Sequence, residues 1–157
     1  GRTLPGFIGD IGYAQSNRER YEGFCQALTY AGKKVDSSLC LTTPLGIDTY
    51  REEIDTFLSS LSRMPDAFVC ASDYVACILM QLLEKRGLRV PEDVAVSGFD
   101  NNTEDLLAEH LTTVQVFNEE LGARLALQIL YRIKYPNTPH EVTYLGTNVL
   151  YRDSTGD

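Results

Sequence analysis

The sequence contains few histidines and cysteines. Histidine occurs twice, at His110 and His140, and neither has a cysteine or a second histidine at the spacing of a metal site. Four cysteines are present without any C-x-x-C pair. Three of them lie in apolar stretches, where a free thiol behaves as a small hydrophobic group. We therefore expect no bound metal and no cofactor, and we expect the reduced thiols of a cytoplasmic protein.

Long apolar runs and excess basic charge are also missing. No apolar run approaches the about 20 residues that a membrane-spanning helix needs, and the first residues do not resemble a signal peptide. Asp and Glu number 22 against 14 Lys and Arg, so the formal net charge is -8. Such a chain offers no surface suited to phosphate groups. We expect no membrane partner, and we expect any nucleic acid to be bound by another segment.

Enzyme signatures are largely absent. The G-x-x-G-x-x-G spacing of Gly6, Gly9 and Gly12 is not the dinucleotide-binding pattern, and neither a P-loop lysine nor a G-x-S-x-G turn occurs. The chain is therefore not expected to be an enzyme. One catalytic alternative stays open, in which Asp73 and Asp100 act as an acid and base pair, which requires a raised pKa on one of the carboxylates.

What the sequence does contain is one clear β-α-β unit at residues 66–102. A short apolar run is followed by an amphipathic stretch that ends at Gly87 and then by a second apolar run. This pattern predicts two parallel strands joined by a helix. Because parallel sheets are covered on both faces, it predicts an α/β fold, a doubly wound and mainly parallel sheet flanked by helices.

The other segments continue this alternation in both directions. A strand is expected at residues 7–9, a helix at 16–31, a weak strand at 35–41 and a helix after residue 48. A short helix at 103–109, a strand at 111–117, a helix at 118–133 and one or two strands at 142–151 follow. Ser16 and Glu19 have capping-box spacing, Asp48 is a second candidate N-cap, and Gly32 supplies a helix end.

Polar side chains follow the predicted strands on one side of the sheet. Asp10 follows the first strand, Ser72 and Asp73 follow the third, Asp100 follows the fourth, and Arg20 lies early in the first helix. Open α/β sheets bind ligands outside the carboxyl ends of their strands. An arginine donates in a planar fork and a carboxylate accepts, so together they can hold vicinal hydroxyl groups. These five residues are the candidate ligand-binding site.

Each candidate also has a purely structural interpretation. Ser72 and Asp73 have the residue types that cap the following helix. Asp100 can serve only to orient a turn. Arg20 can pair with Glu19 or Glu22 on a solvated helix face.

Several motifs agree in order and spacing with one known family. They are Arg20-Tyr-Glu-Gly23-Phe24 with Ala27, Leu28 and Gly32; Pro65-Asp66-Ala67 leading to Ser72-Asp73; Gly87-Leu-Arg-Val-Pro91-Glu-Asp93-Val-Ala-Val-Ser-Gly98-Phe-Asp100-Asn101; Leu111-Thr112-Thr113-Val114; Leu121-Gly122; and Arg152-Asp-Ser154-Thr155. Across nearly its whole length the chain resembles the effector domain of transcriptional regulators of the lactose-repressor and galactose-repressor type. That resemblance implies a two-lobed, type I periplasmic-binding-protein-like fold, in which a small effector in the cleft between the lobes changes the affinity for DNA.

The resemblance also implies roles for single residues. Arg20, in the R-x-x-G-F motif, and Asp100, in the G-F-D motif, are expected to grip effector hydroxyl groups. Ser72 takes a cleft-floor position that is usually Asn, and Asp73 beside it is mainly a cap. The family often has an aromatic residue near Pro44 and a Gln at the position of Val116, and this chain has neither. These departures leave the ligand class open, with a sugar as the leading expectation.

The family domain begins well before Phe7, so the resemblance implies that the chain is a single effector-domain fragment. Residues 10–116 and 142–155 are expected to form the C-terminal lobe, and the helix at 117–135 is expected to pack on a missing N-terminal lobe. We expect the apolar stripe of that helix to be bare or covered by a second copy; it consists of Leu121, Leu125, Leu130 and Ile133.

The sequence therefore favours the effector-binding domain of a bacterial DNA-binding transcriptional regulator. Its expected partners are a small-molecule effector, which the family resemblance indicates is a carbohydrate, a second copy in a homodimer, and DNA only through a helix-turn-helix headpiece outside this chain. The alternative is an exported solute-binding protein for sugars, which the four unpaired cysteines disfavour.

Overall fold

The structure is a computed structural model and describes residues 2–101 and 106–156. Its body is built on a parallel sheet with the strand order β2-β1-β3-β4. The strands are β1 (Pro5–Ile8), β2 (Cys40–Leu41), β3 (Ala67–Cys70) and β4 (Ala95–Ser97). Phe7 lies opposite Cys40 on one side and Val69 on the other. The expected α/β fold with a mainly parallel sheet is confirmed.

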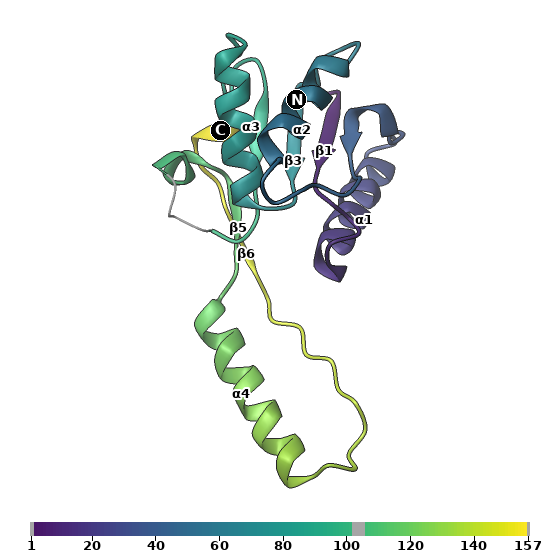
Figure 1. Cartoon of the computed structure of the whole chain (residues 1–157), viewed down its shortest axis with the longest axis vertical. Helices are drawn as coiled ribbons and strands as arrows, with labels where there is room; N and C mark the ends of the chain where they lie inside the picture. Colours follow the sequence, from purple (N-terminus) through teal and green to yellow (C-terminus); the bar gives the residue numbers. More distant parts are fainter. Residues whose placement is uncertain (1, 102–105, 157) are drawn as a thin grey trace.

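Helices cover both faces of this sheet (Figure 1). Helix α1 (Gln15–Tyr30) packs on one face, and α2 (Tyr50–Ser60) and α3 (Asp73–Lys85) pack on the other. Alternate residues of β1 point to opposite faces. Phe7 packs with Phe24 and Leu28 of α1, whereas Ile8 belongs to the larger cluster formed with α2 and α3. Each such fully buried side chain contributes about 1.5–3 kcal/mol, so the body has a core on each side of the sheet.

A second, two-stranded sheet carries the chain away from the body. Strand β5 (Thr113–Gln115) pairs antiparallel with β6 (Asn148–Leu150). Isolated parallel bridges join Ser97 to Thr112 and Asp100 to Gln115, so β5 also runs alongside the end of β4. Because β5 runs in the direction of β4, it leaves the body at the carboxyl ends of the parallel strands.

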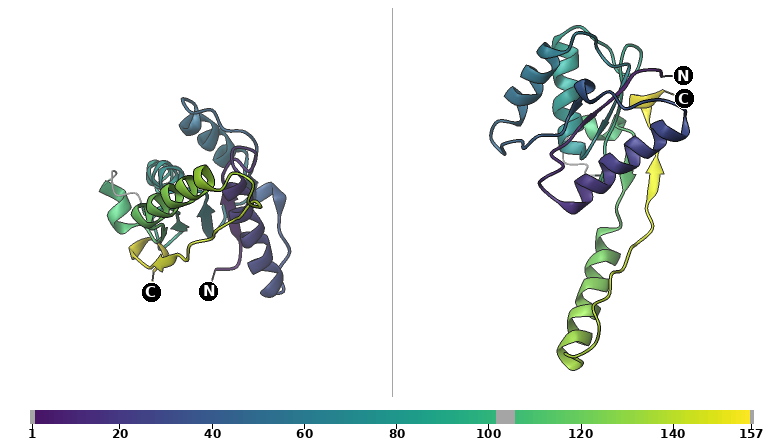
Figure 2. Two further views of the ribbon diagram at one scale, coloured as in Figure 1. Left: turned by 90° about the horizontal axis from the view of Figure 1, so that it is seen from below. Right: turned by 90° about the vertical axis from the view of Figure 1, so that its right-hand side faces the viewer.

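Beyond β5, helix α4 (Asn118–Lys134) projects from the body, and residues 135–147 return beside it to β6 (Figures 1 and 2). None of the described side chains of α4 is buried. The stripe residues Leu121, Leu125, Leu130 and Ile133 are 47%, 57%, 63% and 72% exposed, which confirms the expected bare face. The described parts of the chain also contain the short 3-10 helices η1 (Ser37–Leu39), η2 (Leu106–His110) and η3 (Asp153–Thr155). Among the described residues, no helix has the length and apolar character needed to span a membrane.

Some predicted boundaries were wrong. Helix α1 begins one residue before Ser16, and its N-cap position is Ala14, which makes no side-chain cap bond. The N-cap of α2 is Thr49 rather than Asp48. At the start of α1 another local contact replaces the expected cap, because the side chain of Asn17 donates to the carbonyl of Asp10, seven residues earlier. The weak strand at 35–41 is reduced to β2, and the short helix expected at 103–109 lies partly outside the described residues.

Candidate ligand-binding site

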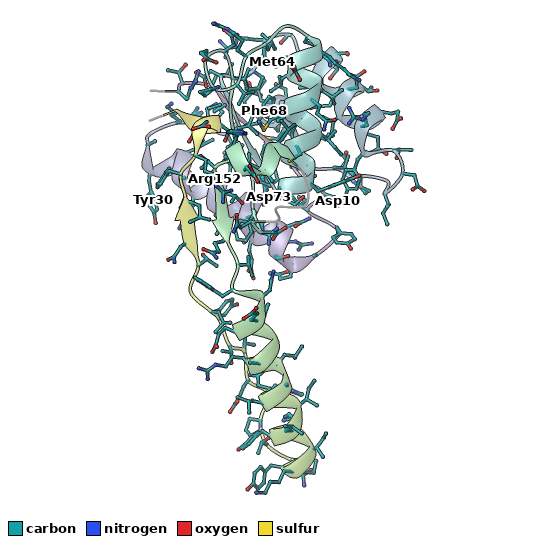
Figure 3. The ribbon with its side chains drawn as sticks, turned by 90° about the vertical axis from the view of Figure 1, so that its left-hand side faces the viewer. Asp10, Tyr30, Met64, Phe68, Asp73 and Arg152 are labelled. Atoms are coloured by element: carbon teal, nitrogen blue, oxygen red, sulfur yellow. The ribbon has the colours of Figure 1, made fainter. Side chains whose placement is uncertain are left out.

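The candidate site lies where the chain leaves β1 and β3 for opposite faces of the sheet. These strands are neighbours, but β1 leads to α1 and β3 leads to α3. In open α/β sheets such a reversal marks the switch point, where ligands bind in the crevice outside the carboxyl ends of the strands. The strand ends approach closely, since a Cβ on Gly9 would lie 2.2 Å from the Cβ of Ala71. Figure 3 shows Asp10, Asp73 and Arg152 nearer to the projecting helix than Met64 and Phe68, which lie toward the opposite end of the body.

Arg20 and Asp100 meet at this crevice although 80 residues separate them in the sequence. Arg20 Nη2 lies 3.2 Å from Asp100 Oδ1 and donates a hydrogen bond to it. Arg20 Nη1 donates to the carbonyl oxygen of Ala71, at the end of β3. Its guanidinium carbon lies 3.7 Å from the ring centroid of Phe99, which gives a cation–π contact. Three neighbours thus fix the orientation of Arg20, and the interpretation of Arg20 as a surface partner of Glu19 or Glu22 is wrong.

The ion pair is only partly shielded from water. The Arg20 side chain is 19% exposed and the Asp100 side chain is 41% exposed. Burial raises the pKa of Asp100; the charge of Arg20 opposes this shift, and the charge of Asp73 adds to it. Burial likewise lowers the pKa of Arg20 against the attraction of Asp100. Both charges are therefore held where solvation is incomplete, a setting in which additional polar contacts from a ligand are favourable.

Asp10 organises the loops around the crevice. Its Oδ1 accepts hydrogen bonds from the backbone N–H groups of Gly12 and Tyr13, at 2.8 and 3.0 Å. Its Oδ2 accepts from the N–H of Leu45 at 3.3 Å. The side chain is buried, and it ties the loop after β1 to the loop after β2. The structure thus gives Asp10 a supporting position at the site.

Ser72 caps helix α3, whereas Asp73 bonds to segments on the other side of the site. Ser72 is the N-cap of α3, and its hydroxyl accepts from the N–H of Val75 at 3.3 Å. Asp73 is 2% exposed and accepts a hydrogen bond of 2.6 Å from the hydroxyl of Thr113. Its own N–H donates to the carbonyl of Phe99. Asp73 therefore connects α3 to the segments around Asp100, and Ser72 is a partly buried polar group two residues after β3.

Three residues of this region had no role in the sequence-based site. Phe99 lies under Arg20, Thr113 bonds to Asp73, and Arg152 donates to the side chain of Asn101. Phe99 precedes Asp100 directly, which was an available signal. The other two come from segments 12 and 51 residues away from Asn101, so no local spacing could reveal them. Among the described residues, no cluster of His, Cys, Asp and Glu suits a metal ion.

A doubly wound parallel sheet with charged groups at its switch point defines one lobe of a periplasmic-binding-protein-like domain. Residues 1–155 match the family described as a periplasmic binding protein-like domain. The chain is 35% identical over 117 residues to the HTH-type transcriptional regulator DegA of Bacillus subtilis, covering 74% of this chain and 34% of DegA. It is 34% identical over 142 residues to the HTH-type regulator CelR of Thermobifida fusca, covering 87% of this chain and 40% of CelR.

Solved structures agree with these relatives. A complex of the transcriptional regulator CelR with cellobiose matches with a TM-score of 0.87 and 29% identity, over 98% of this chain and 47% of that chain. The fold is also that of a LacI family regulator from Enterococcus faecium with bound ribose, with a TM-score of 0.78 and 24% identity, over 99% of this chain and 57% of that chain.

The chain belongs to the effector domains of the LacI/GalR family of transcriptional regulators, which have the periplasmic-binding-protein-like fold. It spans about a third to two fifths of the length of DegA and CelR. These relatives are transcriptional regulators and not enzymes, so the interpretation of Asp73 and Asp100 as an acid and base pair is not retained.

Proposed function

We propose that this chain senses a sugar for a bacterial DNA-binding regulator, and that Arg20 and Asp100 hold the hydroxyl groups of that sugar. The observation that carries the proposal is the partly exposed Arg20–Asp100 pair at the switch point of the sheet. The chemistry of the pair suits the hydroxyl groups of a sugar, because Arg20 presents a planar donor and Asp100 an ionised acceptor side by side. The CelR relative, whose structure contains cellobiose, supports the choice of a sugar.

The pair retains capacity for a ligand. A guanidinium has five N–H donors, and two of those of Arg20 are used in the contacts with Ala71 and Asp100. Asp100 has two carboxylate oxygens, and Oδ1 is the one bound to Arg20. Hydrogen bonds that involve a charged group contribute about 1.5–3 kcal/mol each. Three or four of them approach the about 8 kcal/mol of a micromolar complex. Ser72 borders the crevice as a further polar contact, with Asp10 and Asp73 holding the loops in place.

A second lobe completes the cleft in this proposal. The apolar side chains of α4 are exposed on several sides, and a helix that is apolar around most of its surface is normally buried. The structural relatives are longer, since this chain covers 47% of the CelR chain. We assign α4 to packing against a lobe formed by residues outside this sequence. A sugar that binds the closed arrangement more tightly than the open one then shifts the equilibrium between them.

DNA is contacted elsewhere in the protein under this proposal. The net charge of -8 is unfavourable for a phosphate-binding surface, so the effector domain acts on DNA affinity from a distance. The regulator works as a homodimer in the cytoplasm. All four cysteines are free, which suits a reducing compartment.

The test is calorimetry on the complete protein with a panel of sugars that includes cellobiose and ribose. Arg20→Ala and Asp100→Ala each remove a charged hydrogen-bonding group, and we expect each to weaken binding by at least about tenfold while the protein stays folded. Arg89→Ala is the matched control, because Arg89 precedes β4 at the opposite edge of the sheet and pairs with Asp93 there. Full affinity in either site variant removes that residue from the site.

A further inference from the structure

The turn that presents Asp100 has an unfavourable backbone conformation. Asp100 has φ of 110° and Asn101 has φ of 54°, and neither residue is glycine. Residues with side chains rarely adopt positive φ, and they keep it only where surrounding contacts hold them there. The position of the Asp100 carboxylate therefore depends on what holds this turn.

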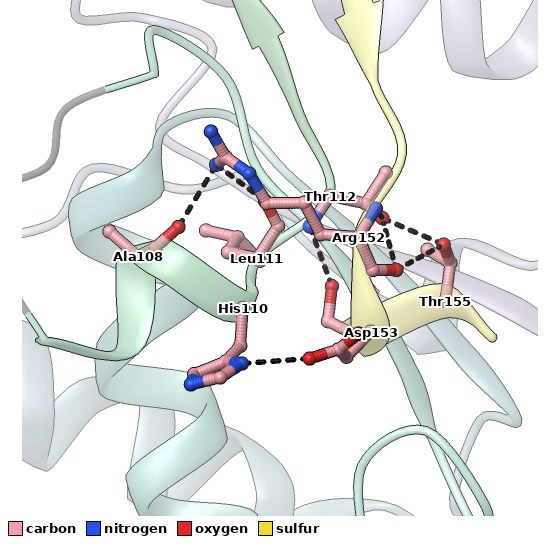
Figure 4. A network of polar contacts seen from close by, with 8 residues as sticks. Ala108, His110, Leu111, Thr112, Arg152, Asp153 and Thr155 are labelled. Atoms are coloured by element: carbon pink, nitrogen blue, oxygen red, sulfur yellow. Dashed lines mark hydrogen bonds and ion pairs between the residues drawn. The ribbon is translucent and has the colours of Figure 1, made fainter.

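One set of contacts comes from Arg152, near the end of the chain. Its Nη2 donates to Asn101 Oδ1 at 2.8 Å. Its Nη1 donates to the carbonyls of Ala108 and Leu111, both at 3.0 Å. Figure 4 shows Arg152 between these carbonyls and Thr112. The backbone N–H of Arg152 donates to the hydroxyl of Thr112 at 2.8 Å, so the chain two residues after β6 is also fixed to the residue before β5.

A second set of contacts approaches the turn from inside the body. The hydroxyl of Thr113 accepts from the N–H of Asn101 at 3.3 Å and donates to Asp73 Oδ1 at 2.6 Å. Thr113 is 1% exposed, and Asp73 beside it is 2% exposed. The same turn is closed by the N–H of Asp100, which donates to the carbonyl of Val114 at 2.9 Å. Strand β5 thus holds the turn from one side, and Arg152 holds it from the other.

We propose that Arg152 and Thr113 are positioning residues that hold the Asp100 turn in its ligand-binding conformation. The inference deepens the proposed function and rests on it, since Asp100 is taken as the ligand contact. Neither Arg152 nor Thr113 bonds to Arg20 in the structure; each acts through Asn101. Because β5 and β6 are the two strands that join α4 to the body, the network also links the position of α4 to that of Asp100.

The experiment measures hydrogen exchange at the amide of Asp100 in the complete, ligand-free protein. This amide is a suitable reporter because its acceptor is Val114, which none of the variants changes. Thr113→Val removes the hydroxyl and keeps the shape, whereas Thr113→Ser keeps the hydroxyl. Arg152→Lys keeps the charge and loses the fork that reaches three acceptors. Ile54→Val in the core of α2 is the control for a general loss of stability.

We expect exchange at Asp100 to become at least about tenfold faster in Thr113→Val and Arg152→Lys, because each change removes a buried or charge-assisted hydrogen bond. Thr113→Ser and Ile54→Val should exchange as the unmodified protein does at this amide. Calorimetry with cellobiose and ribose on the same proteins should show the same ranking of affinities.

Unchanged exchange in both Thr113→Val and Arg152→Lys overturns the proposal, as does faster exchange in Ile54→Val to the same extent. Arg152 is only partly buried, so Arg152→Lys decides the matter if Thr113→Val does not fold. If exchange responds as expected but neither sugar binds the unmodified protein, the positioning roles stand and the choice of these sugars fails. Faster exchange with unaltered sugar affinity overturns the link between the turn and binding.

Discussion

Replacement of Gly98 by alanine should displace Asp73 and destabilise the protein. Gly98 follows β4 directly, where the chain passes the start of α3. A Cβ at this position would lie 2.2 Å from Asp73 Oδ1, 2.9 Å from Leu111 Cδ2 and 3.1 Å from the Cα of Asp73. Since the last contact is with backbone, rotation of a side chain alone does not relieve the clash. The Asp73 carboxylate has to move by about 1 Å or more to restore ordinary contact distances.

Two costs follow from that displacement. Overpacking of a well-packed region costs about 1–3 kcal/mol. Loss of the Thr113–Asp73 hydrogen bond, whose acceptor is a buried carboxylate, costs about 1.5–3 kcal/mol more. We therefore expect Gly98→Ala to lower the free energy of unfolding by about 2.5–6 kcal/mol. For a domain of this size the melting temperature should fall by about 5–25 °C.

The assay is thermal unfolding followed by circular dichroism, with Gly23→Ala as the matched control. Gly23 lies within α1, and an added Cβ there has no neighbour within 4 Å. Alanine should stabilise that helix by about 0.5–1 kcal/mol. A Gly98→Ala protein that melts at the temperature of the unmodified protein would refute the close packing of Asp73 against β4.

Three further predictions concern ionisable groups and the exposed helix. Hydrogen bonds from the side chain and backbone of Arg89 lower the pKa of Asp93 to about 2, and NMR titration should show this value. The ionised Asp93 should contribute to stability above the ordinary carboxylate pKa, and this contribution should be lost as the pH falls toward 2. Because burial raises the pKa of Asp100, sugar affinity measured by calorimetry should fall as the pH drops through that raised value, and an affinity independent of pH there would argue against an ionised Asp100 as acceptor. Replacement of Leu125 and Leu130 by Glu should reduce the binding of a hydrophobic dye to residues 1–157, and dye fluorescence equal to that of the unmodified chain would mean that α4 is not the exposed apolar surface.

The sequence predicted the fold well where local patterns determine it. The apolar run before Ser72, the amphipathic stretch up to Gly87 and the apolar run before Gly98 became β3, α3 and β4. The meeting of Arg20 and Asp100 was also predictable, because the carboxyl ends of parallel strands lie at one edge of a sheet. Applying that rule requires only the predicted positions of the strands and helices along the chain, and no knowledge of which distant residues contact each other.

The supporting contacts could not be predicted in the same way. Arg152 reaches Asn101 across 51 residues, and the path between them runs out along α4 and back. No spacing in the sequence encodes such a contact. The capping box at Ser16 failed for a different reason, since α1 already begins at Gln15 and the neighbouring Asn17 bonds to the carbonyl of Asp10. One local side-chain contact took the place of another.

An NMR titration of the complete protein with cellobiose and with ribose tests the central claim most directly. Side-chain Nε–Hε signals of arginine report each guanidinium separately, and the Asp100 carboxyl carbon can be followed in the same sample. We predict that the Arg20 and Asp100 signals shift together as sugar is added and that the Arg89 signal stays in place. Saturable binding of either sugar with the Arg20 and Asp100 signals unmoved would contradict the claim that this pair holds the ligand.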